Sequence, residues 1–273
     1  MKRLFVFSLL FLGLLMVCAG ISCAHFGVLQ PSYSTVSDAQ HNELDLILAF
    51  AHPMEQQGMD LARPKSVFAV SGETREDLLP KLVPETILGH SAWKAKYTLQ
   101  RPGVVYFAME PEPYWEPAED KYIIHYTKTC VAAFGVEEGW EKPVGLRTEI
   151  LPLTRPFGLY AGTVFRGQVL LDGKPAPGAI VEIEYDNHEG RLEAPNDFFI
   201  TQTVQADQNG IFVVSLPFSG WWGMAALSEP GITLSHDGVQ KPVELGAVLW
   251  IEAAAPHFKP ASKSGEMGKS KSK

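Results

Sequence analysis

HNELDLILAFAH, residues 41–52, alternates apolar and polar positions with a period of two. Leu44, Leu46, Leu48 and Phe50 therefore fall on one face, which predicts a β-strand with one buried side. No segment carries a convincing 3.6-residue apolar repeat, so we predict an all-β protein. Further stretches with the character of a strand are residues 94–99, 103–109 and 121–129.

The second half of the chain repeats this pattern in shorter units separated by turns. Asp207-Gln208-Asn209-Gly210 is the clearest turn, because Asn-Gly supplies the positive φ angles that a tight hairpin needs. Short strands at this spacing predict a small β-sandwich of immunoglobulin-like or transthyretin-like (carboxypeptidase-regulatory-like) kind. The predicted strands are residues 161–171, 179–185, 201–206, 211–216, 221–227 and 247–253.

These patterns divide the chain into two β-sandwich domains. We place the N-terminal domain at residues 25–150 and the C-terminal domain at residues 158–255. Residues 151–157 hold two prolines, which predicts a stiff linker. Residues 256–273 are rich in lysine and serine and are predicted to form a disordered tail.

The first 24 residues have the three-part layout of a secretory signal peptide. A short basic start precedes an apolar run over residues 4–17, and Ser22 and Ala24 suit a signal-peptidase site. A run of this length is shorter than the ~18 residues that a membrane span needs. We expect cleavage after Ala24, a periplasmic or otherwise exported protein without a membrane span, and His25 as the new N-terminus. The competing interpretation is a lipoprotein acylated on Cys23.

Composition bounds the function. The chain has 273 residues and a formal net charge of −8, from 23 Lys+Arg against 31 Asp+Glu. Such an acidic protein repels phosphate backbones and attracts cations, which argues against nucleic acid as a partner. Cys130 is left alone once the leader is removed, so we expect no disulfide and predict that Cys130 is a small buried hydrophobe.

No catalytic motif is present. The sequence lacks GxSxG, HExxH, the P-loop glycine pattern and CxxC, and we therefore expect a protein that is not an enzyme. Residues 110–120 form a proline-rich acidic loop, EPEPYWEPAED. This loop either steers cations toward a site or is simply a solvated loop whose aromatic pair packs on the sandwich.

His25 is the most informative candidate ligand. Cleavage before it would expose an α-amine next to an imidazole, and one residue would then chelate a divalent cation through two nitrogens. Nitrogen donors of this kind suit Ni²⁺, Co²⁺, Cu²⁺ and Zn²⁺ better than Ca²⁺ or Mg²⁺. The alternative is a histidine left by chance at a frayed terminus.

Two further histidines lie on predicted strands. His52 ends the strand of residues 44–51, on the face of Phe50, and Pro53 follows it. His125 lies in mid-strand, on the side shared with Ile123. Each is either a metal ligand or a histidine that only satisfies local hydrogen bonds.

Seven pieces of the sequence, taken in order, form a recognisable set: Ala24-His25-Phe26, Ala51-His52-Pro53, Tyr126–Thr129, Glu149–Leu153, Gly167–Pro175, Asp207–Phe212 and Ser219–Trp222. In this order they resemble the exported DUF4198 proteins, grouped as the periplasmic component of a cobalt/nickel ABC-type (ECF-like) transport system. The resemblance covers residues 24–228 and implies an accessory to Ni²⁺ or Co²⁺ uptake, with His25 and His52 as ligands. Ala51 departs from the glycine usual before the second histidine.

From these observations we predict capture of Ni²⁺ or Co²⁺ and delivery to a membrane uptake complex, with His25, His52 and His125 as ligands. Two alternatives stay open. One is a copper-binding protein, either a carrier or a histidine-brace oxidative enzyme, and Zn²⁺ is a further possible ion. The other is an adhesion or carbohydrate-binding module without a metal.

Overall fold

The computed structural model describes residues 24–258. The predicted signal peptide therefore lies outside the described residues except for Ala24, and the predicted tail except for residues 256–258. In this part of the chain nearly all regular structure is β, as predicted, with three single-turn 3₁₀ helices. These helices are η1 (Ala39–His41), η2 (Leu79–Lys81) and η3 (Asp197–Phe199).

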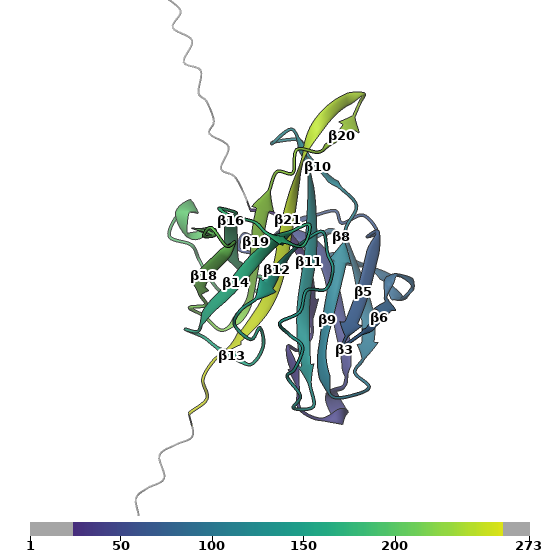
Figure 1. Cartoon of the computed structure of the whole chain (residues 1–273), viewed down its shortest axis with the longest axis vertical. Coiled ribbons are helices and arrows are strands. Elements are labelled where there is room, and N and C mark those ends of the chain that lie inside the picture. Colours follow the sequence, from purple (N-terminus) through teal and green to yellow (C-terminus); the bar gives the residue numbers. More distant parts are fainter. Residues whose placement is uncertain (1–23, 259–273) are drawn as a thin grey trace, which may run out of the picture.

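Within residues 24–258 the strands form three sheets (Figure 1). The first sheet has five strands: β1 (Phe26–Pro31), β3 (Glu43–His52), β8 (His90–Thr98), β7 (Val83–Ile87) and β4 (Gln57–Met59). The third has four: β12 (Thr148–Pro152), β14 (Val164–Leu171), β15 (Lys174–Pro175) and β18 (Ile211–Ser215).

The second sheet has 12 strands within the described residues and belongs to both halves of the molecule. Its continuous path is β17 (Gln202–Gln205), β16 (Ile180–Tyr185), β19 (Gly220–Ser228), β21 (Val239–Ala254), β11 (Lys121–Ala133), β9 (Gly103–Glu110), β5 (Ser66–Ser71) and β6 (Thr74–Asp77). Shorter strands join its sides: β2 (Thr35–Val36), β10 (Tyr114–Glu116), β13 (Leu159–Tyr160) and β20 (Thr233–His236).

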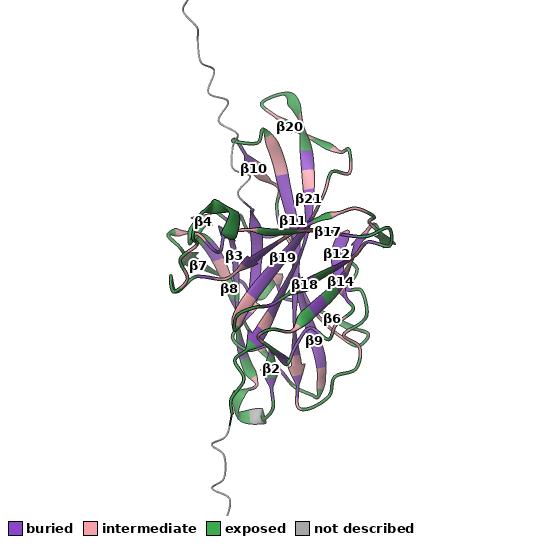
Figure 2. Ribbon diagram, turned by 90° about the vertical axis from the view of Figure 1, so that its left-hand side faces the viewer, coloured by how far each residue is buried: buried purple, intermediate pink, exposed green. Residues whose placement is uncertain are grey.

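Two sandwiches arise because the five-stranded sheet covers one end of the shared sheet and the four-stranded sheet covers the other. The predicted face of β3 builds the N-terminal core, where Leu44, Leu46 and Leu48 are fully buried against Phe107 of β9. The C-terminal core forms around Phe165 and other apolar residues of β14, β16, β18, β19 and β21. Figure 2 shows buried residues running along the central strands β11, β19 and β21. The prediction of two β-sandwiches is confirmed.

The predicted linker, residues 151–157, is wrong in its first part. Leu151 and Pro152 belong to β12, which pairs antiparallel with β14 from Thr148↔Leu171 to Pro152↔Gly167. Strand β12 lies at the edge of its sheet, where a proline without an N–H leaves no ladder bond unmade. The chain thus enters the C-terminal sandwich several residues earlier than its prolines suggest.

The seam between the sandwiches is a parallel pairing of β11 with β21, from Tyr122↔Val243 to Thr129↔Trp250. Strand β1 lies over this seam, where Phe26 packs edge-on against Trp250 and the Trp250 indole N–H donates to the Gly27 carbonyl at 2.8 Å. The N-terminal end of the described chain is therefore fixed at the junction of the two halves. No helix among residues 24–258 is long and apolar enough to cross a membrane.

Candidate metal centre

His25 and His52 lie side by side because β1 pairs antiparallel with β3. The first register pair of the two strands is Phe26↔Ala51, so the next position outward sets His25 opposite His52. Their ring centroids are 4.5 Å apart, and both side chains are buried. The two histidines for which the resemblance implies a ligand role therefore meet at one place, although 27 positions separate them in the chain.

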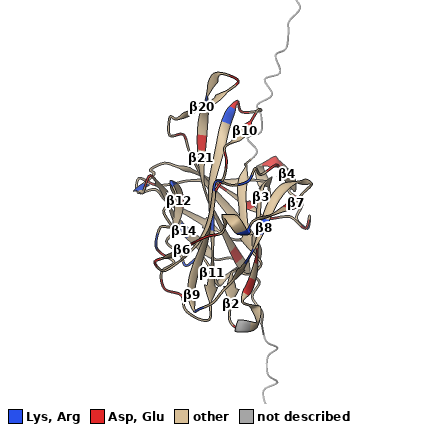
Figure 3. Ribbon diagram, turned by 90° about the vertical axis from the view of Figure 1, so that its right-hand side faces the viewer, with Lys and Arg blue, Asp and Glu red and all other residues tan. Residues whose placement is uncertain are grey.

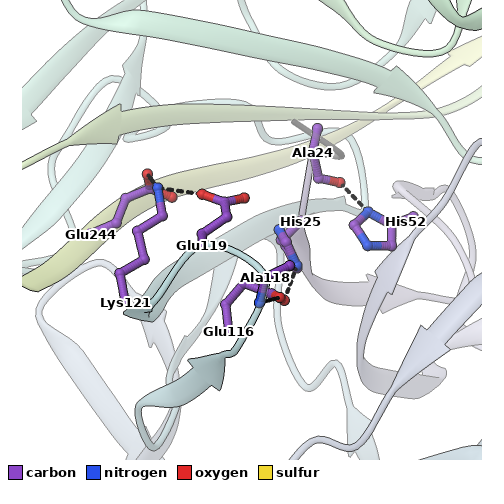
Figure 4. A network of polar contacts seen from close by, with 8 residues as sticks. All are labelled: Ala24, His25, His52, Glu116, Ala118, Glu119, Lys121 and Glu244. Carbon is purple, nitrogen blue, oxygen red and sulfur yellow. Dashed lines mark hydrogen bonds and ion pairs between the residues drawn. The ribbon is translucent and has the colours of Figure 1, made fainter. Parts of the chain in front are cut away.

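The carbonyl group of Ala24 is hydrogen-bonded to the imidazole of His52. The His52 Nδ1 is 2.9 Å from the Ala24 carbonyl oxygen (Figure 4). A carbonyl oxygen only accepts hydrogen bonds, so Nδ1 carries the ring proton of His52 and points at the peptide unit that joins Ala24 to His25. Ala24 is itself only 2 % exposed, which makes it an integral part of the present packing.

Glu116 holds the other side of His25. Its Oε2 atom is 2.8 Å from the His25 Nε2, and its Oε1 accepts the Ala118 N–H at 2.9 Å. Burial, followed by the neighbouring His52, lowers the pKa of His25, although Glu116 acts in the opposite direction. A lowered pKa keeps the imidazole neutral near pH 7, the state in which a histidine binds a metal.

His125 lies close to this pair but turns its nitrogens elsewhere. It is fully buried, its Nδ1 accepts the Gly27 N–H at 3.4 Å, and burial lowers its pKa to about 3. The Nε2 has no hydrogen-bond partner among the described residues, and the ring packs on Gly246, where an added Cβ would lie 2.5 Å from Nε2. The structure thus brings His125 into the neighbourhood without aiming a free nitrogen at His25 and His52.

Acidic residues surround the pair on the side of β10 and β21. Lys121 contacts Glu119 at 2.5 Å and Glu244 at 2.6 Å (Figure 4), and these contacts raise its pKa although burial alone would lower it. Burial, with Glu244 and Glu119 nearby, raises the pKa of Glu182 to about 7. Figure 3 shows acidic segments on β21 and beside β10. The surroundings favour an approaching cation.

A cavity of about 120 Å³ lies next to the site. Phe50 and Tyr114, whose rings lie 5.7 and 6.2 Å from that of His25, form part of its wall. Asp60 and Glu112 also line it. The cavity joins an aromatic wall to two carboxylates.

Within residues 24–258 no group of three or more His, Cys, Asp or Glu side chains is arranged to hold a metal ion. The side chains provide two adjacent imidazoles, with the Glu116 carboxylate bonded to one of them. The fit to a metal is therefore partial while Ala24 is attached, since the main-chain nitrogen of His25 is an amide. A third nitrogen donor requires a free amine at His25.

The DUF4198 model, described as a domain of unknown function, matches residues 22–229, about three quarters of the chain. This chain belongs to the DUF4198 family. The match contains His25, His52, Glu116 and His125, whereas Glu244 lies outside it. No curated protein matches this DUF4198 chain.

The solved structures that are similar to this DUF4198 protein have low sequence identities and low TM-scores. The D0–D1 domain of intimin is 13 % identical over 82 % of this chain and 99 % of its own, with a TM-score of 0.21. A putative carbohydrate-binding protein from Bacteroides uniformis is 10 % identical over 81 % and 99 %, with a TM-score of 0.25. A putative membrane-anchored protein from Corynebacterium diphtheriae is 10 % identical over 88 % and 62 %, with a TM-score of 0.23.

No sequence pattern of this DUF4198 protein singles out Glu116. The acidic loop of residues 110–120 was expected to steer cations or to be solvated, but one of its carboxylates bonds directly to His25. The acidic loop is visible in the sequence, but its contact with His25 is not, because 91 positions separate Glu116 from His25. Cys130 is buried and free, as predicted.

Proposed function

We propose that this protein is exported, is not an enzyme, and captures Ni²⁺ or Co²⁺ outside the cytoplasmic membrane for a membrane uptake complex. The proposed ligands are the α-amine and Nδ1 of His25 together with Nδ1 of His52. Three nitrogen donors without a thiolate suit a borderline cation that must be released again. Water or a ligand from the partner complex completes the coordination shell.

The observation that carries this proposal is the contact between the Ala24 carbonyl oxygen and the His52 Nδ1 at 2.9 Å. In a peptide unit the oxygen lies about 2.3 Å from the nitrogen of the next residue. The nitrogen of His25 is therefore within about 5 Å of the His52 Nδ1. Cleavage after Ala24 would turn this nitrogen into an amine and remove the carbonyl oxygen that holds the ring proton of His52 on Nδ1. This proton can then move to Nε2, which leaves a lone pair on Nδ1 for the metal.

The same contact supports the proposal that cleavage after Ala24 completes the site. With Ala24 attached, the amide nitrogen of His25 is a poor donor and the His52 Nδ1 is engaged. Without Ala24, two imidazoles and one amine converge, and the carboxylates of Glu119 and Glu244 lower the cost of bringing in a dication. His125, neutral at physiological pH, supports β1 through its bond to Gly27 and is left outside the proposed ligand set.

The test compares two forms of the protein, one beginning at His25 and one that retains Ala24, titrated with Ni²⁺, Co²⁺, Cu²⁺ and Zn²⁺ by calorimetry. We expect one ion per chain and affinity about 10–100-fold higher for the form that begins at His25. His52→Ala should lose this difference, and His188→Ala, at an exposed histidine, should keep it. Equal affinity of the two forms would overturn the proposal.

The same titration separates the candidate ions. Tightest binding of Cu²⁺ would favour the copper alternative, and oxidation of a polysaccharide by O₂ in the presence of Cu²⁺ and a reductant would show that the protein is an enzyme. N-terminal sequencing of exported material tests whether the chain begins at His25 or carries a lipid on Cys23. Nickel uptake by cells that carry His52→Ala tests the delivery step.

A further inference from the structure

We propose that Glu116 is the positioning residue of this centre, and that it selects which nitrogen of His25 faces the metal. The effect of Glu116 on metal binding rests on the proposed function, whereas its effect on the tautomer of His25 concerns the metal-free protein. It begins from the bond between the Glu116 Oε2 and the His25 Nε2, 2.8 Å long and buried, with side chains 11 % and 8 % exposed.

The bond defines the tautomer of His25. A carboxylate accepts hydrogen bonds, so Nε2 carries the ring proton and Nδ1 keeps its lone pair. The α-amine and Nδ1 of one histidine close a six-membered ring with a metal through Cα, Cβ and Cγ, whereas Nε2 lies too far along the ring. Glu116 therefore leaves free the one nitrogen that chelates together with the amine. Carboxylates commonly play this role behind metal-binding histidines.

Glu116 is held for this task from outside the sheet that carries His25. Its strand β10 pairs with β11 through Trp115↔Tyr122 and Glu116↔Lys121, and Trp115 stacks on His236 of β20 with ring centroids 3.8 Å apart. The second carboxylate oxygen takes the Ala118 N–H. Both carboxylate oxygens therefore accept a hydrogen bond, which restricts rotation of the Glu116 side chain away from His25.

The neighbouring cation does not compete for Glu116. Lys121 is its register partner, yet the Lys121 ammonium bonds to Glu119 and Glu244 instead. Glu119 and Glu244 thereby leave Glu116 available to His25. This arrangement also provides the matched control, since Glu119 is a nearby carboxylate of the same loop that has a different partner.

The test records ¹⁵N chemical shifts of the His25 ring in the metal-free protein that begins at His25, together with Ni²⁺ and Cu²⁺ titrations. The wild type should show the Nε2–H tautomer. Glu116→Leu should mix the tautomers and weaken metal binding about 10–100-fold. Glu116→Gln has one acceptor oxygen for the two N–H groups of His25 and Ala118, and should weaken binding less than Glu116→Leu does. Glu119→Gln should leave the tautomer unchanged.

Two outcomes would overturn the inference: an Nδ1–H tautomer in the wild type, or a Glu116→Leu protein with unchanged tautomer and affinity. The wild-type spectrum alone shows which His25 nitrogen carries the proton, so it tests the inference even if Glu116→Leu fails to fold. If the wild type binds no metal but Glu116→Leu alone scrambles the tautomer, the proposed function fails and the positioning role stands. If the wild type binds metal tightly and Glu116→Leu changes neither the affinity nor the tautomer, the positioning role fails and the proposed function stands.

Discussion

Lys128 is a fully buried cation at the junction of β11 and β12. Its ammonium is 2.5 Å from Glu149, whose oxygens also accept the N–H groups of Val144 and Gly145. Burial lowers the pKa of Lys128 although Glu149 acts in the opposite direction. The pair joins the last long strand of the N-terminal sandwich to the first strand of the C-terminal one.

Glu149→Leu should destabilise the protein by about 3–5 kcal/mol, because it leaves the Lys128 charge buried without a partner. The measurement is urea unfolding followed by tryptophan fluorescence. Adding Lys128→Met to Glu149→Leu should recover part of the loss, since it removes the buried unpaired charge while the N–H groups of Val144 and Gly145 still lack their acceptor. A double variant no more stable than the single one would contradict this account.

Gly246 marks a close approach of two strands at the site. A Cβ at this position would lie 2.3–2.5 Å from ring atoms of His125, which is buried on all sides. Gly246→Ala should therefore cost about 1–3 kcal/mol in unfolding free energy, measured by chemical denaturation. In a His125→Ala background the same substitution should cost less, because the ring no longer blocks the methyl group. Equal costs in both backgrounds would show that the clash is not with His125.

At the scale of elements, alternation predicted β3 and its buried face, but no period-two pattern marked β1. Residues 26–31, FGVLQP, bury residues on both faces, since one side packs in the N-terminal core and the other on the seam. The contact of His25 with His52 depends on this strand and on its register. The sequence therefore offers His25 and His52 as candidate ligands, and the pairing of β1 with β3 brings them together.

Strand β16 places a buried carboxylate, Glu184, and a half-buried one, Glu182, on one face, and together they make the stability of the protein depend on pH. Burial raises the pKa of Glu184 to about 8 and that of Glu182 to about 7. Because the ordinary value is 4.5, the unfolded chain ionises first, and the contribution of these groups to stability is lost as pH rises from about 4.5 to about 8.

Glu184→Gln should flatten this part of the stability curve, measured as unfolding midpoints between pH 5 and pH 9. An amide resembles the protonated acid: its oxygen accepts the Met54 N–H, and its NH₂ meets the Thr201 hydroxyl in place of Oε1. Glu193→Gln, at an unburied carboxyl group in the loop after β16, serves as the control. A control with the same flattened curve would contradict the role of Glu184.

At the scale of the molecule, the boundary between sandwiches is structural rather than sequential. Two prolines mark the predicted boundary at residues 151–157, but β11 and β21 hydrogen-bond directly across that boundary and are more than 100 positions apart in the chain. A parallel pairing of this range leaves no local pattern, since most residues of the paired stretches are buried on both faces and β11 mixes polar with apolar residues. This is why two separate domains were predicted and a shared sheet was found.

A shared sheet predicts that the two sandwiches unfold together. Unfolding either half would strip the seam of eight register pairs and expose Trp250, which is fully buried beneath β1. Calorimetry should therefore show one transition whose calorimetric and van't Hoff enthalpies agree. Phe107→Ala in the N-terminal core and Phe212→Ala in the C-terminal core remove fully buried rings, and each should lower the same single transition by about 3–5 kcal/mol. Two resolved transitions, each sensitive to one substitution only, would mean that the seam does not couple the halves, and the centre above it would then rest on β1 and β3 alone.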